Sequence, residues 1–259
     1  MRTLDFKNLS IDIQNWIKNY IDSANADGVV VGLSGGIDSS VAASLCVNAI
    51  GKTKVIGLGL PCESPIKDLE DAKLVARHLG IEFMVIDLTK PYNQFLELFA
   101  PIIKPNTISN ANIKPRLRMI ALYYAGQSLG KYLVAGTGNR AELAIGYFTK
   151  YGDGGVDFEP LGMLYKSEVR ELGKVLEIPK HIIEKPPSPG LWSGQTDEGE
   201  IGLLYNTIDE ILYRMDYNLG FGGLNLEEVN KVKEMMKKAE HKLLMPPMYE
   251  IIKDESSTN

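Results

Sequence analysis

The sequence predicts an α/β fold in which a doubly wound parallel sheet is flanked by helices. Four short apolar runs are the strand candidates, at residues 29–33, 54–60, 82–88 and 132–136. Their nearly continuous apolar character is typical of parallel strands covered on both faces. Amphipathic stretches separate the first three runs, at about 38–50 and 67–79. This alternation favours strand–helix–strand units, whose ligand site lies beyond the carboxyl ends of the strands.

Helical spacing of apolar residues accounts for much of the remaining chain. The helices expected from it lie at about 4–24, 110–129, 198–215 and 226–241. Because proline is tolerated in the first turn of a helix, Pro115 predicts that the long second helix begins near residues 112–114. The last helices would form an extra C-terminal group beside the sheet.

Composition argues against several classes of function. The net charge is −5, with no run of Lys and Arg, so nothing indicates nucleic-acid binding. No apolar run reaches the roughly 18 residues that a membrane-spanning helix needs. Cys46 and Cys62 form no CxxC pair, which argues against a disulfide framework or a thiolate zinc site. We therefore expect a cytoplasmic protein that acts on small molecules.

The stretch SGGIDSS, residues 34–40, follows the first strand and opens a helix. Its glycines allow an anion to approach the backbone N–H groups, and the helix dipole favours negative charge there. Asp38 would repel a phosphate unless a divalent cation lay between them, so it is interpreted as a Mg²⁺ ligand. The alternative is a helix start with a tight glycine turn.

Two later segments carry further candidates. In GTGNRAE, Thr137 and Glu142 straddle a predicted helix start and could aim at one phosphate–metal unit, although Glu142 could equally complement the helix dipole. In KYGDGGVD, Lys150, Asp153 and Asp157 lie on a glycine-rich backbone that suits closure over a ligand, with a solvated turn as the alternative. The non-periodic stretches 146–162 and 184–200 predict long loops, which are usually functional or disordered.

Taken together, the motifs SGGIDSS, NIKPRLRM, GTGNRAE, GYFTKYGDGGVD, LYKSEV, KPPSPGLWSGQTDE and EHK resemble those of the NAD synthetase family over about residues 29–242. SGGIDSS alone is similar to the loop of the wider ATP pyrophosphatase superfamily. The resemblance implies a Rossmann-like sheet and synthesis of NAD from deamido-NAD, ATP and a nitrogen source. About 28 residues precede the first strand, too few for the glutaminase domain of some members, which implies the ammonia-dependent type.

The resemblance also implies a single domain over 1–259. Its parts are an N-terminal helix at about 4–24, a nucleotide-binding core at about 28–180, and a loop with C-terminal helices at about 181–245. A homodimer, with no nucleic-acid or membrane partner, is implied as well.

The residues whose roles the resemblance implies fall into four groups. The ATP group comprises Gly32, Leu33, Ser34, Gly35, Gly36, Ile37, Asp38, Ser39, Thr137, Lys166 and Ser188. The Mg²⁺ group comprises Asp38 and Glu142. The deamido-NAD group comprises Arg116, Tyr124, Lys150, Asp157, His241 and Lys242. The catalytic group comprises Asp153, near the ammonia site, and Lys166.

Two other interpretations remain open at this point. One is a tRNA-modifying enzyme with the same ATP-cleaving loop, which would need a basic surface and often a catalytic cysteine pair. The other is a non-catalytic nucleotide sensor of the same fold, from which some of Asp38, Glu142, Asp153 and Lys166 would be missing. Net charge opposes the first, and the presence of all four residues opposes the second.

Overall fold

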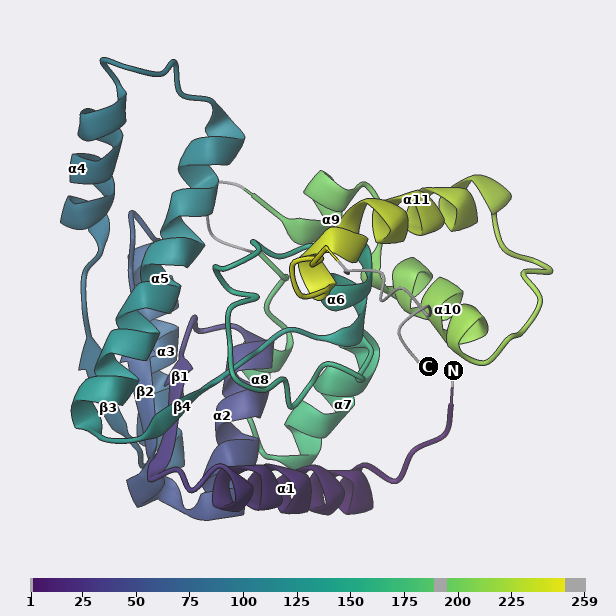
Figure 1. Ribbon diagram of the computed structural model, residues 1–259. Helices are drawn as coiled ribbons and strands as arrows, with labels where there is room; N and C mark the ends of the chain where they lie inside the picture. Colours follow the sequence, from purple (N-terminus) through teal and green to yellow (C-terminus); the bar gives the residue numbers. More distant parts are fainter. Residues whose placement is uncertain (1, 189–194, 250–259) are drawn as a thin grey trace, which may run out of the picture.

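A computed structural model describes residues 2–188 and 195–249 (Figure 1). The central part of the predicted loop 184–200 and the end of the chain therefore lie outside the described residues. The strands are β1 (Gly28–Gly32), β2 (Val55–Gly59), β3 (Glu82–Val85) and β4 (Tyr132–Ala135). The helices are α1 (Phe6–Ser23), α2 (Ile37–Ile50), α3 (Ile66–Leu79), α4 (Thr89–Phe99), α5 (Thr107–Leu129), α6 (Arg140–Ile145), α7 (Lys166–Val175), α8 (Lys180–Ile183), α9 (Asp197–Ile201), α10 (Tyr205–Asp216) and α11 (Leu226–Leu243), with a 3₁₀ turn at Lys52–Lys54.

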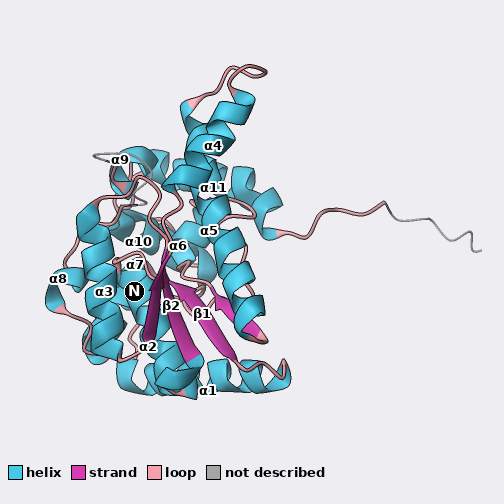
Figure 2. Cartoon of the chain, turned by 90° about the vertical axis from the view of Figure 1, so that its left-hand side faces the viewer, coloured by secondary structure: helices cyan, strands magenta, loops and turns pink. Residues whose placement is uncertain are grey.

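The four strands form one parallel sheet in the order β3-β2-β1-β4 (Figure 2). Val30 in β1 pairs with Ile56 in β2 on one side and with Val134 in β4 on the other. The chain thus builds the sheet outward from β1 through β3 and then returns to the opposite side of β1. Such a reversal opens a crevice at the carboxyl ends of β1 and β4, where ligands of open α/β sheets bind.

Both faces of the sheet are covered, as the apolar runs predict. Val29 and Val31 point to one face, where they join a buried cluster with residues of α1, α2, α3 and α7. Val30, which points the other way, joins a second cluster beneath α4 and α5. The alternation follows from the two-residue period of a strand. The predicted doubly wound α/β fold is confirmed.

The C-terminal helices form a third hydrophobic cluster beside the sheet. Ala141 of α6, Ile208 of α10 and Val232 of α11 are fully or almost fully buried there. These helices lie together on the right of Figure 1, away from α4 and α5. Among the described residues, no helix is both long and apolar enough to cross a bilayer.

The predicted start of the long helix is wrong. α5 begins at Thr107, eight residues before Pro115, which therefore lies inside the helix. Asn106 accounts for the early start, because its side chain and that of Ser109 form a reciprocal capping box. Pro115 is buried close to Gly152, and this packing offsets the backbone hydrogen bond that a proline cannot donate.

Other boundaries differ for local reasons. The helix expected over 198–215 is two helices, α9 and α10, because Gly202 adopts a left-handed φ of 68° and ends the first. The third strand ends at Val85 instead of residue 88. The sequence analysis assigned no helix to α4, which follows this strand directly.

Candidate active site

The loop between β1 and α2 lies at the end of the sheet where the chain order reverses. Ser34 is exposed, and its Oγ lies 3.0 Å from Ser39 Oγ. Gly36 is the residue before α2, and no side chain caps this helix. Leu33 and Ile37 on either side are buried in the core, so only their backbone can face a ligand. The loop therefore presents hydroxyls and backbone N–H groups at an uncapped helix start, which suits an anion.

Three predicted residues from three helices meet in one ion cluster. Lys166 Nζ lies 2.6 Å from Asp38 Oδ2 and 3.2 Å from Glu142 Oε1. The Lys166 side chain is 2% exposed, whereas both carboxylates remain 17% exposed. The lysine thus approaches from the interior while the carboxylates keep access to the crevice. A buried ammonium with two carboxylate partners is held in place electrostatically.

Asn139 connects two members of this cluster. Its Nδ2 donates to Asp38 Oδ1 at 3.1 Å, and its Oδ1 accepts from the Glu142 backbone N–H at 3.1 Å. Asn139 and Glu142 also form the capping box of α6. The sequence analysis missed this residue, although N-x-x-E before a helical stretch is a capping-box pattern that could have found it.

A tyrosine and a third carboxylate complete the buried side of the cluster. Tyr205 OH lies 2.8 Å from Asp197 Oδ2 and 3.2 Å from Glu142 Oε1. Lys166 Nζ also lies 4.9 Å from the centre of the Tyr205 ring. Asp197 is 5% exposed, and its Oδ1 is buried without a hydrogen-bond partner. Sequence reasoning missed both residues, because α9 and α10 reach the cluster only through tertiary packing.

The ionisation of the cluster follows from burial and charge. Burial raises the pKa of Glu142 to about 7; Lys166 opposes this rise, and Asp38 adds to it. Burial also disfavours the charged form of Lys166, but Asp38 and Glu142 outweigh it and raise the lysine pKa. The ammonium is therefore retained at neutral pH, and burial shifts the Glu142 carboxyl toward its neutral form.

Asp38 and Glu142 are suited to share a divalent cation. Both already bind one positive group, Lys166 Nζ, and both are carboxylates that remain partly accessible from the crevice. Among the described residues, no group of three or more His, Cys, Asp or Glu side chains is arranged to hold a metal ion. Mg²⁺ commonly takes one or two carboxylates and completes its shell with phosphate oxygens and water. The pair fits that pattern.

A small cavity of about 40 Å³ adjoins the cluster. Thr137, Glu142 and Asp153 all line it, so the structure brings together residues predicted from two separate motifs. Asp153 Oδ1 accepts from the Thr149 backbone N–H at 2.9 Å. The surrounding protein desolvates this carboxylate and raises its pKa, although the residue as a whole stays exposed.

Glu159 also lines this cavity and was missed by the sequence analysis. Its Oε2 accepts from the Gly138 backbone N–H at 3.0 Å. Burial raises its pKa to about 8, against the opposing effect of that hydrogen bond. A Cβ on Gly136 would overlap the Glu159 carboxylate, so a larger residue there would force this side chain to move. No pattern in the sequence marks this glutamate.

Four of the residues predicted to bind deamido-NAD lie close together. Lys150 Nζ donates to the His241 carbonyl, and Arg116 Nη2 donates to the Lys150 carbonyl at 3.4 Å. Lys242 Nζ donates to the Gly146 carbonyl at 2.7 Å and to the Phe148 carbonyl at 2.8 Å. We call Arg116, Lys150, His241 and Lys242 the cationic group. Burial lowers the pKa of Lys242.

The remaining predicted residues lie apart from these groups. Asp157 Oδ2 accepts from the Val134 backbone N–H at 2.7 Å, and its Oδ1 accepts from Tyr123 OH at 3.1 Å. Tyr124 is 74% exposed on α5. Ser188 Oγ donates to the Gln195 carbonyl at 2.7 Å. No described hydrogen bond joins any of them to the ion cluster.

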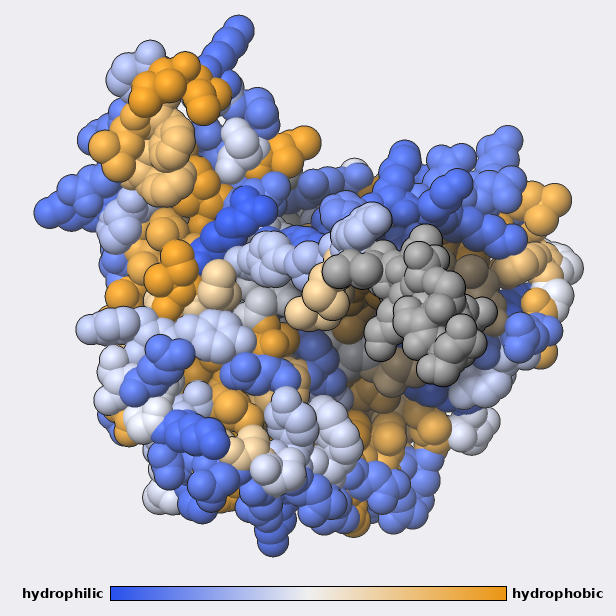
Figure 3. Space-filling view, viewed as in Figure 1, coloured by the Kyte–Doolittle hydropathy of each residue, from blue (hydrophilic) through white to orange (hydrophobic). Residues whose placement is uncertain are grey.

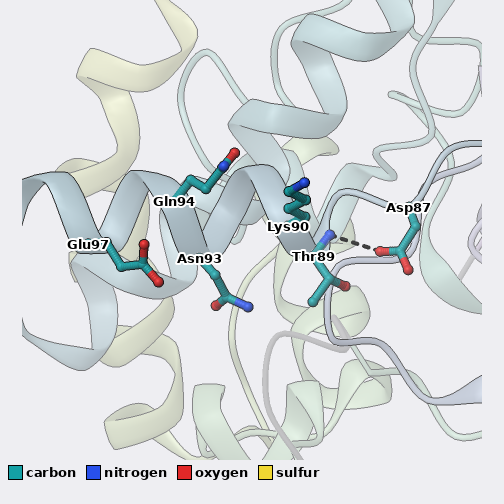
Figure 4. Close-up of a pocket in the computed structure, with 6 residues that line it drawn as sticks. All are labelled: Asp87, Thr89, Lys90, Asn93, Gln94 and Glu97. Carbon is teal, nitrogen blue, oxygen red and sulfur yellow. Dashed lines mark hydrogen bonds between the residues drawn. The ribbon is translucent and has the colours of Figure 1, made fainter.

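A larger surface hollow lies elsewhere, along the start of α4 (Figure 4). It is lined by Asp87, Thr89, Lys90, Asn93, Gln94 and Glu97. The Thr89 backbone N–H donates to Asp87 Oδ1 at 2.8 Å, which turns the chain into the helix. None of its lining residues belongs to the ion cluster or the cationic group, so we assign it no part in the chemistry.

Comparison with known proteins decides the family. A family model described as NAD synthase matches residues 9–246. The chain belongs to the NAD synthase family. An NH(3)-dependent NAD(+) synthetase from Carboxydothermus hydrogenoformans is 47% identical over 234 residues, covering 90% of this chain and 93% of that relative. This NAD synthase family member can thus be compared with relatives of its own length.

Two solved structures share the whole architecture. An NMN synthetase from Francisella tularensis has a TM-score of 0.86 at 37% identity, covering 95% of this chain and 100% of that one. An NH3-dependent NAD synthetase from Campylobacter jejuni, in complex with the nitrate ion, has a TM-score of 0.82 at 31% identity, covering 96% and 100%. Both structures therefore share the overall fold of this chain.

Proposed function

We propose that this protein is an ammonia-dependent NAD synthetase. It would adenylate the nicotinate carboxylate of deamido-NAD with ATP and then amidate it with ammonia, giving NAD, AMP and pyrophosphate. The observation that carries the proposal is the ion cluster of Lys166, Asp38 and Glu142 beside an uncapped glycine loop at the sheet's switch point. Membership of the NAD synthase family and relatives named NH(3)-dependent NAD(+) synthetase support it.

In the first step a carboxylate oxygen of the nicotinate attacks the α-phosphorus of ATP and pyrophosphate leaves. Negative charge develops on the leaving pyrophosphate, so positioned positive charge and N–H donors favour the transition state. Lys166 supplies the charge, and the loop from Ser34 to Gly36 supplies the donors. Asp38 and Glu142 would hold Mg²⁺, which supplies further positive charge to the phosphates when bound. Thr137, Ser39 and Ser188 are proposed to contact ATP through their hydroxyls.

In the second step ammonia attacks the acyl carbon of the adenylate and AMP leaves. Ammonium, the main form at neutral pH, must lose a proton before it can attack. Asp153 lies in the cavity next to Thr137 and Glu142, where an anionic oxygen would attract ammonium and accept that proton. The cavity of about 40 Å³ is of the size that one water or ammonia molecule needs.

The cationic group is proposed to bind the dinucleotide. Its amino and guanidinium groups donate mainly to backbone carbonyls, and these contacts can be exchanged for phosphate or carboxylate oxygens. Asp157 and Tyr124 complete the proposed set. Arg116, Ile120 and Tyr124 are spaced four residues apart on α5, and all three are exposed, so they share one stripe of this helix.

We further propose a homodimer built on α4 and α5. These helices form an arm that projects from the sheet, and hydrophobic residues gather on it (Figures 1 and 3). Seven of its large apolar side chains are at least 41% exposed: Phe95, Leu98, Phe99, Ile102, Ile103, Ile108 and Ile120. A contiguous exposed patch of this kind marks an interaction surface, and a second copy would bury it. Light scattering of the wild-type chain and of Leu98→Glu tests this, since the substitution should yield monomers.

Charge and cysteine content bear on where the protein acts and on its partners. We propose a cytoplasmic enzyme that acts on small molecules and uses neither nucleic acid nor membrane as a partner. The net charge of −5 and two buried, unpaired cysteines support this setting.

The test is an assay of purified protein with deamido-NAD, ATP and Mg²⁺, with ammonium or glutamine as the nitrogen source. We expect NAD and AMP in equal amounts with ammonium and none with glutamine. AMP without NAD would show that another acceptor takes the adenylate. Absence of ATP cleavage would favour a nucleotide sensor.

A second candidate is amidation of the corresponding mononucleotide. The structural relative named NMN synthetase favours it, because that protein matches the whole chain at 37% identity. Deamido-NMN in place of deamido-NAD in the same assay separates the two, and we expect kcat/KM to be higher for the dinucleotide. A higher value for the mononucleotide would overturn the substrate assignment while leaving the reaction type intact.

A further inference from the structure

Lys185 lies between α8 and Ser188 and reaches back to the loop that follows β1. Its Nζ lies 2.8 Å from Asp68 Oδ1 and 2.7 Å from Asp71 Oδ2, two carboxylates of α3. The same Nζ donates to the Gly35 carbonyl at 3.2 Å. Lys185 therefore joins three segments that are far apart in the sequence. Lys185 is the first residue of the KPPSPGLWSGQTDE motif, but neither the proposed mechanism nor the resemblance assigns it a role.

This contact is more constrained than an ordinary surface ion pair. Asp71 is 7% exposed, and only 25% of the Lys185 side chain is exposed. Burial disfavours the charge on Lys185, but Asp68 and Asp71 outweigh it and raise its pKa, so the ammonium persists. Exposed pairs contribute little to stability, whereas a pair this enclosed fixes the position of both partners.

The Gly35 backbone is also fixed by close packing. Gly35 has a left-handed φ of 76°, and a Cβ there would overlap the Asp68 carbonyl. Only glycine therefore fits between the loop and the first turn of α3. Lys185 contacts the carbonyl of this same residue, so the loop is held on two sides.

These contacts fix the orientation of the peptide group between Gly35 and Gly36. In a trans peptide the carbonyl of Gly35 and the N–H of Gly36 point in opposite directions. Because Lys185 holds the carbonyl, the Gly36 N–H is directed away from α3, and it donates to Ser34 Oγ at 3.2 Å. Ser34 is exposed to solvent. The Gly36 N–H thus faces the side from which a phosphate would enter.

We propose that Lys185 is a positioning residue for the phosphate chain of ATP: it orients the Gly35–Gly36 peptide so that its N–H binds the departing pyrophosphate. It does so without touching the substrate, by joining residues 185–188 to the glycine loop. This role rests on the proposed function, because it assumes that the loop binds pyrophosphate.

The experiment compares Lys185→Met with the wild-type enzyme in steady-state assays and in calorimetric titrations with inorganic pyrophosphate and Mg²⁺. We expect the KM for ATP and the Kd for pyrophosphate to rise about tenfold. This is the effect of losing the one charge-assisted hydrogen bond from Lys185 to the Gly35 carbonyl, which orients the loop. The KM values for deamido-NAD and ammonium should stay within about twofold. Lys185→Arg, which keeps the charge, should recover most of the loss.

Lys180→Met is the matched control, since Lys180 is exposed on the same segment and pairs only at 3.5 Å with Glu184. It should leave all constants unchanged. If Lys185→Met does not fold, Lys185→Gln, which keeps an N–H donor, carries the same comparison. An equal loss for all three substrates, or a change in melting temperature alone, would overturn the role.

Failure of the proposed function gives a different pattern. If the wild-type protein makes no NAD, the proposed function is wrong. The pyrophosphate titration would still show whether Lys185 affects binding of pyrophosphate to the loop. A wild-type protein that makes NAD, with unchanged ATP and pyrophosphate constants in both Lys185→Met and Lys185→Gln, would sink only the positioning role.

Discussion

The ion cluster and the cationic group use lysines in two different ways. Lys166 is almost fully buried and bonded to the carboxylates of Asp38 and Glu142. Lys150 and Lys242 are half-buried and bonded to backbone carbonyls. The first lysine is bound to groups of opposite charge on other helices. The other two lysines donate to neutral carbonyl groups and lie over aromatic rings.

This difference matches two proposed tasks. Lys166 must stay in place during the reaction, whereas Lys150 and Lys242 must exchange their carbonyl partners for the substrate. A buried ammonium leaves its carboxylates uncompensated if it is removed, so its loss disturbs the whole site. A lysine bonded to a carbonyl can give up that contact for a phosphate oxygen at little cost, because a charged acceptor makes the stronger bond. We therefore expect substitutions in the cluster to act on kcat, and those in the cationic group to act on KM.

The largest effect is expected for Lys166→Met. The substitution removes the positive charge beside the developing pyrophosphate and leaves Asp38 and Glu142 facing each other. We expect kcat/KM to fall by about 10²–10³-fold, the range for a lost electrostatic stabiliser of a transition state. Steady-state rates of AMP formation at saturating Mg²⁺ measure it.

Lys174→Met is the control for that substitution. Lys174 lies on the same helix, is 59% exposed and pairs with Glu171. Its loss should leave the rate unchanged. If Lys166→Met retained more than about a tenth of wild-type kcat, the lysine would not act on the transition state as proposed.

Lys242→Met tests the cationic group in the same way. Its amino group would move from the Gly146 and Phe148 carbonyls to the dinucleotide, so its loss removes a binding contact. We expect the KM for deamido-NAD to rise about tenfold with kcat within about threefold, as for uniform binding. Lys237→Met, an exposed lysine on the same helix, serves as the control. A fall in kcat at unchanged KM would place Lys242 with Lys166 instead.

Asn139→Ala should have an intermediate and mainly structural effect. It removes the cap of α6 and the hydrogen bond to Asp38, for about 1 kcal/mol of stability. The melting temperature should fall by about 2–4 °C, with a modest loss of kcat as Asp38 and Glu142 lose their alignment. Asn139→Asp keeps the cap acceptor but cannot donate to Asp38, so it separates the two roles. Recovery of both stability and kcat in Asn139→Asp would contradict a role in holding Asp38.

The sequence predicted structure best where a local pattern of residues is compatible with few kinds of structure. Apolar runs predicted the sheet because strands covered on both faces tolerate few polar residues. SGGIDSS predicted an anion loop, with a tight glycine turn at a helix start as the alternative, and the structure has an uncapped helix start there. Asp38 and Glu142 were found as candidates because each lies beside such a start.

Sequence reasoning failed where tertiary packing decides. Tyr205 and Asp197 enter the cluster only because α9 and α10 pack against α6, which no local pattern indicates. From the sequence, Lys185 is an ordinary loop lysine; its pairing with Asp68 and Asp71 appears only once the fold places α3 beside it. Pro115 predicts a helix start near residues 112–114, because proline is tolerated in the first turn, but the Asn106 cap begins α5 at Thr107.

The smallest effect on activity is expected for Glu159→Gln, which bears on pH and stability instead. The pKa of Glu159 is raised by burial from 4.5 to about 8, so the folded protein keeps a proton that the unfolded chain releases. Stability from this group is therefore fully present below about pH 4.5 and is lost as pH rises through about 8. Glutamine is neutral at every pH and can still accept the Gly138 N–H.

We therefore expect the melting temperature of the ligand-free wild-type protein to fall from pH 5 to pH 8.5 more steeply than that of Glu159→Gln. Calorimetry at half-unit intervals measures both slopes, and NAD formation should stay within about threefold. Glu171→Gln, on the exposed face of α7, should keep the wild-type slope. Parallel curves for wild type and Glu159→Gln would mean that this carboxylate is ionised in the folded protein. In that case Glu159 would belong with the anionic members of the ion cluster and would add a negative charge to the cavity that Asp153 also lines.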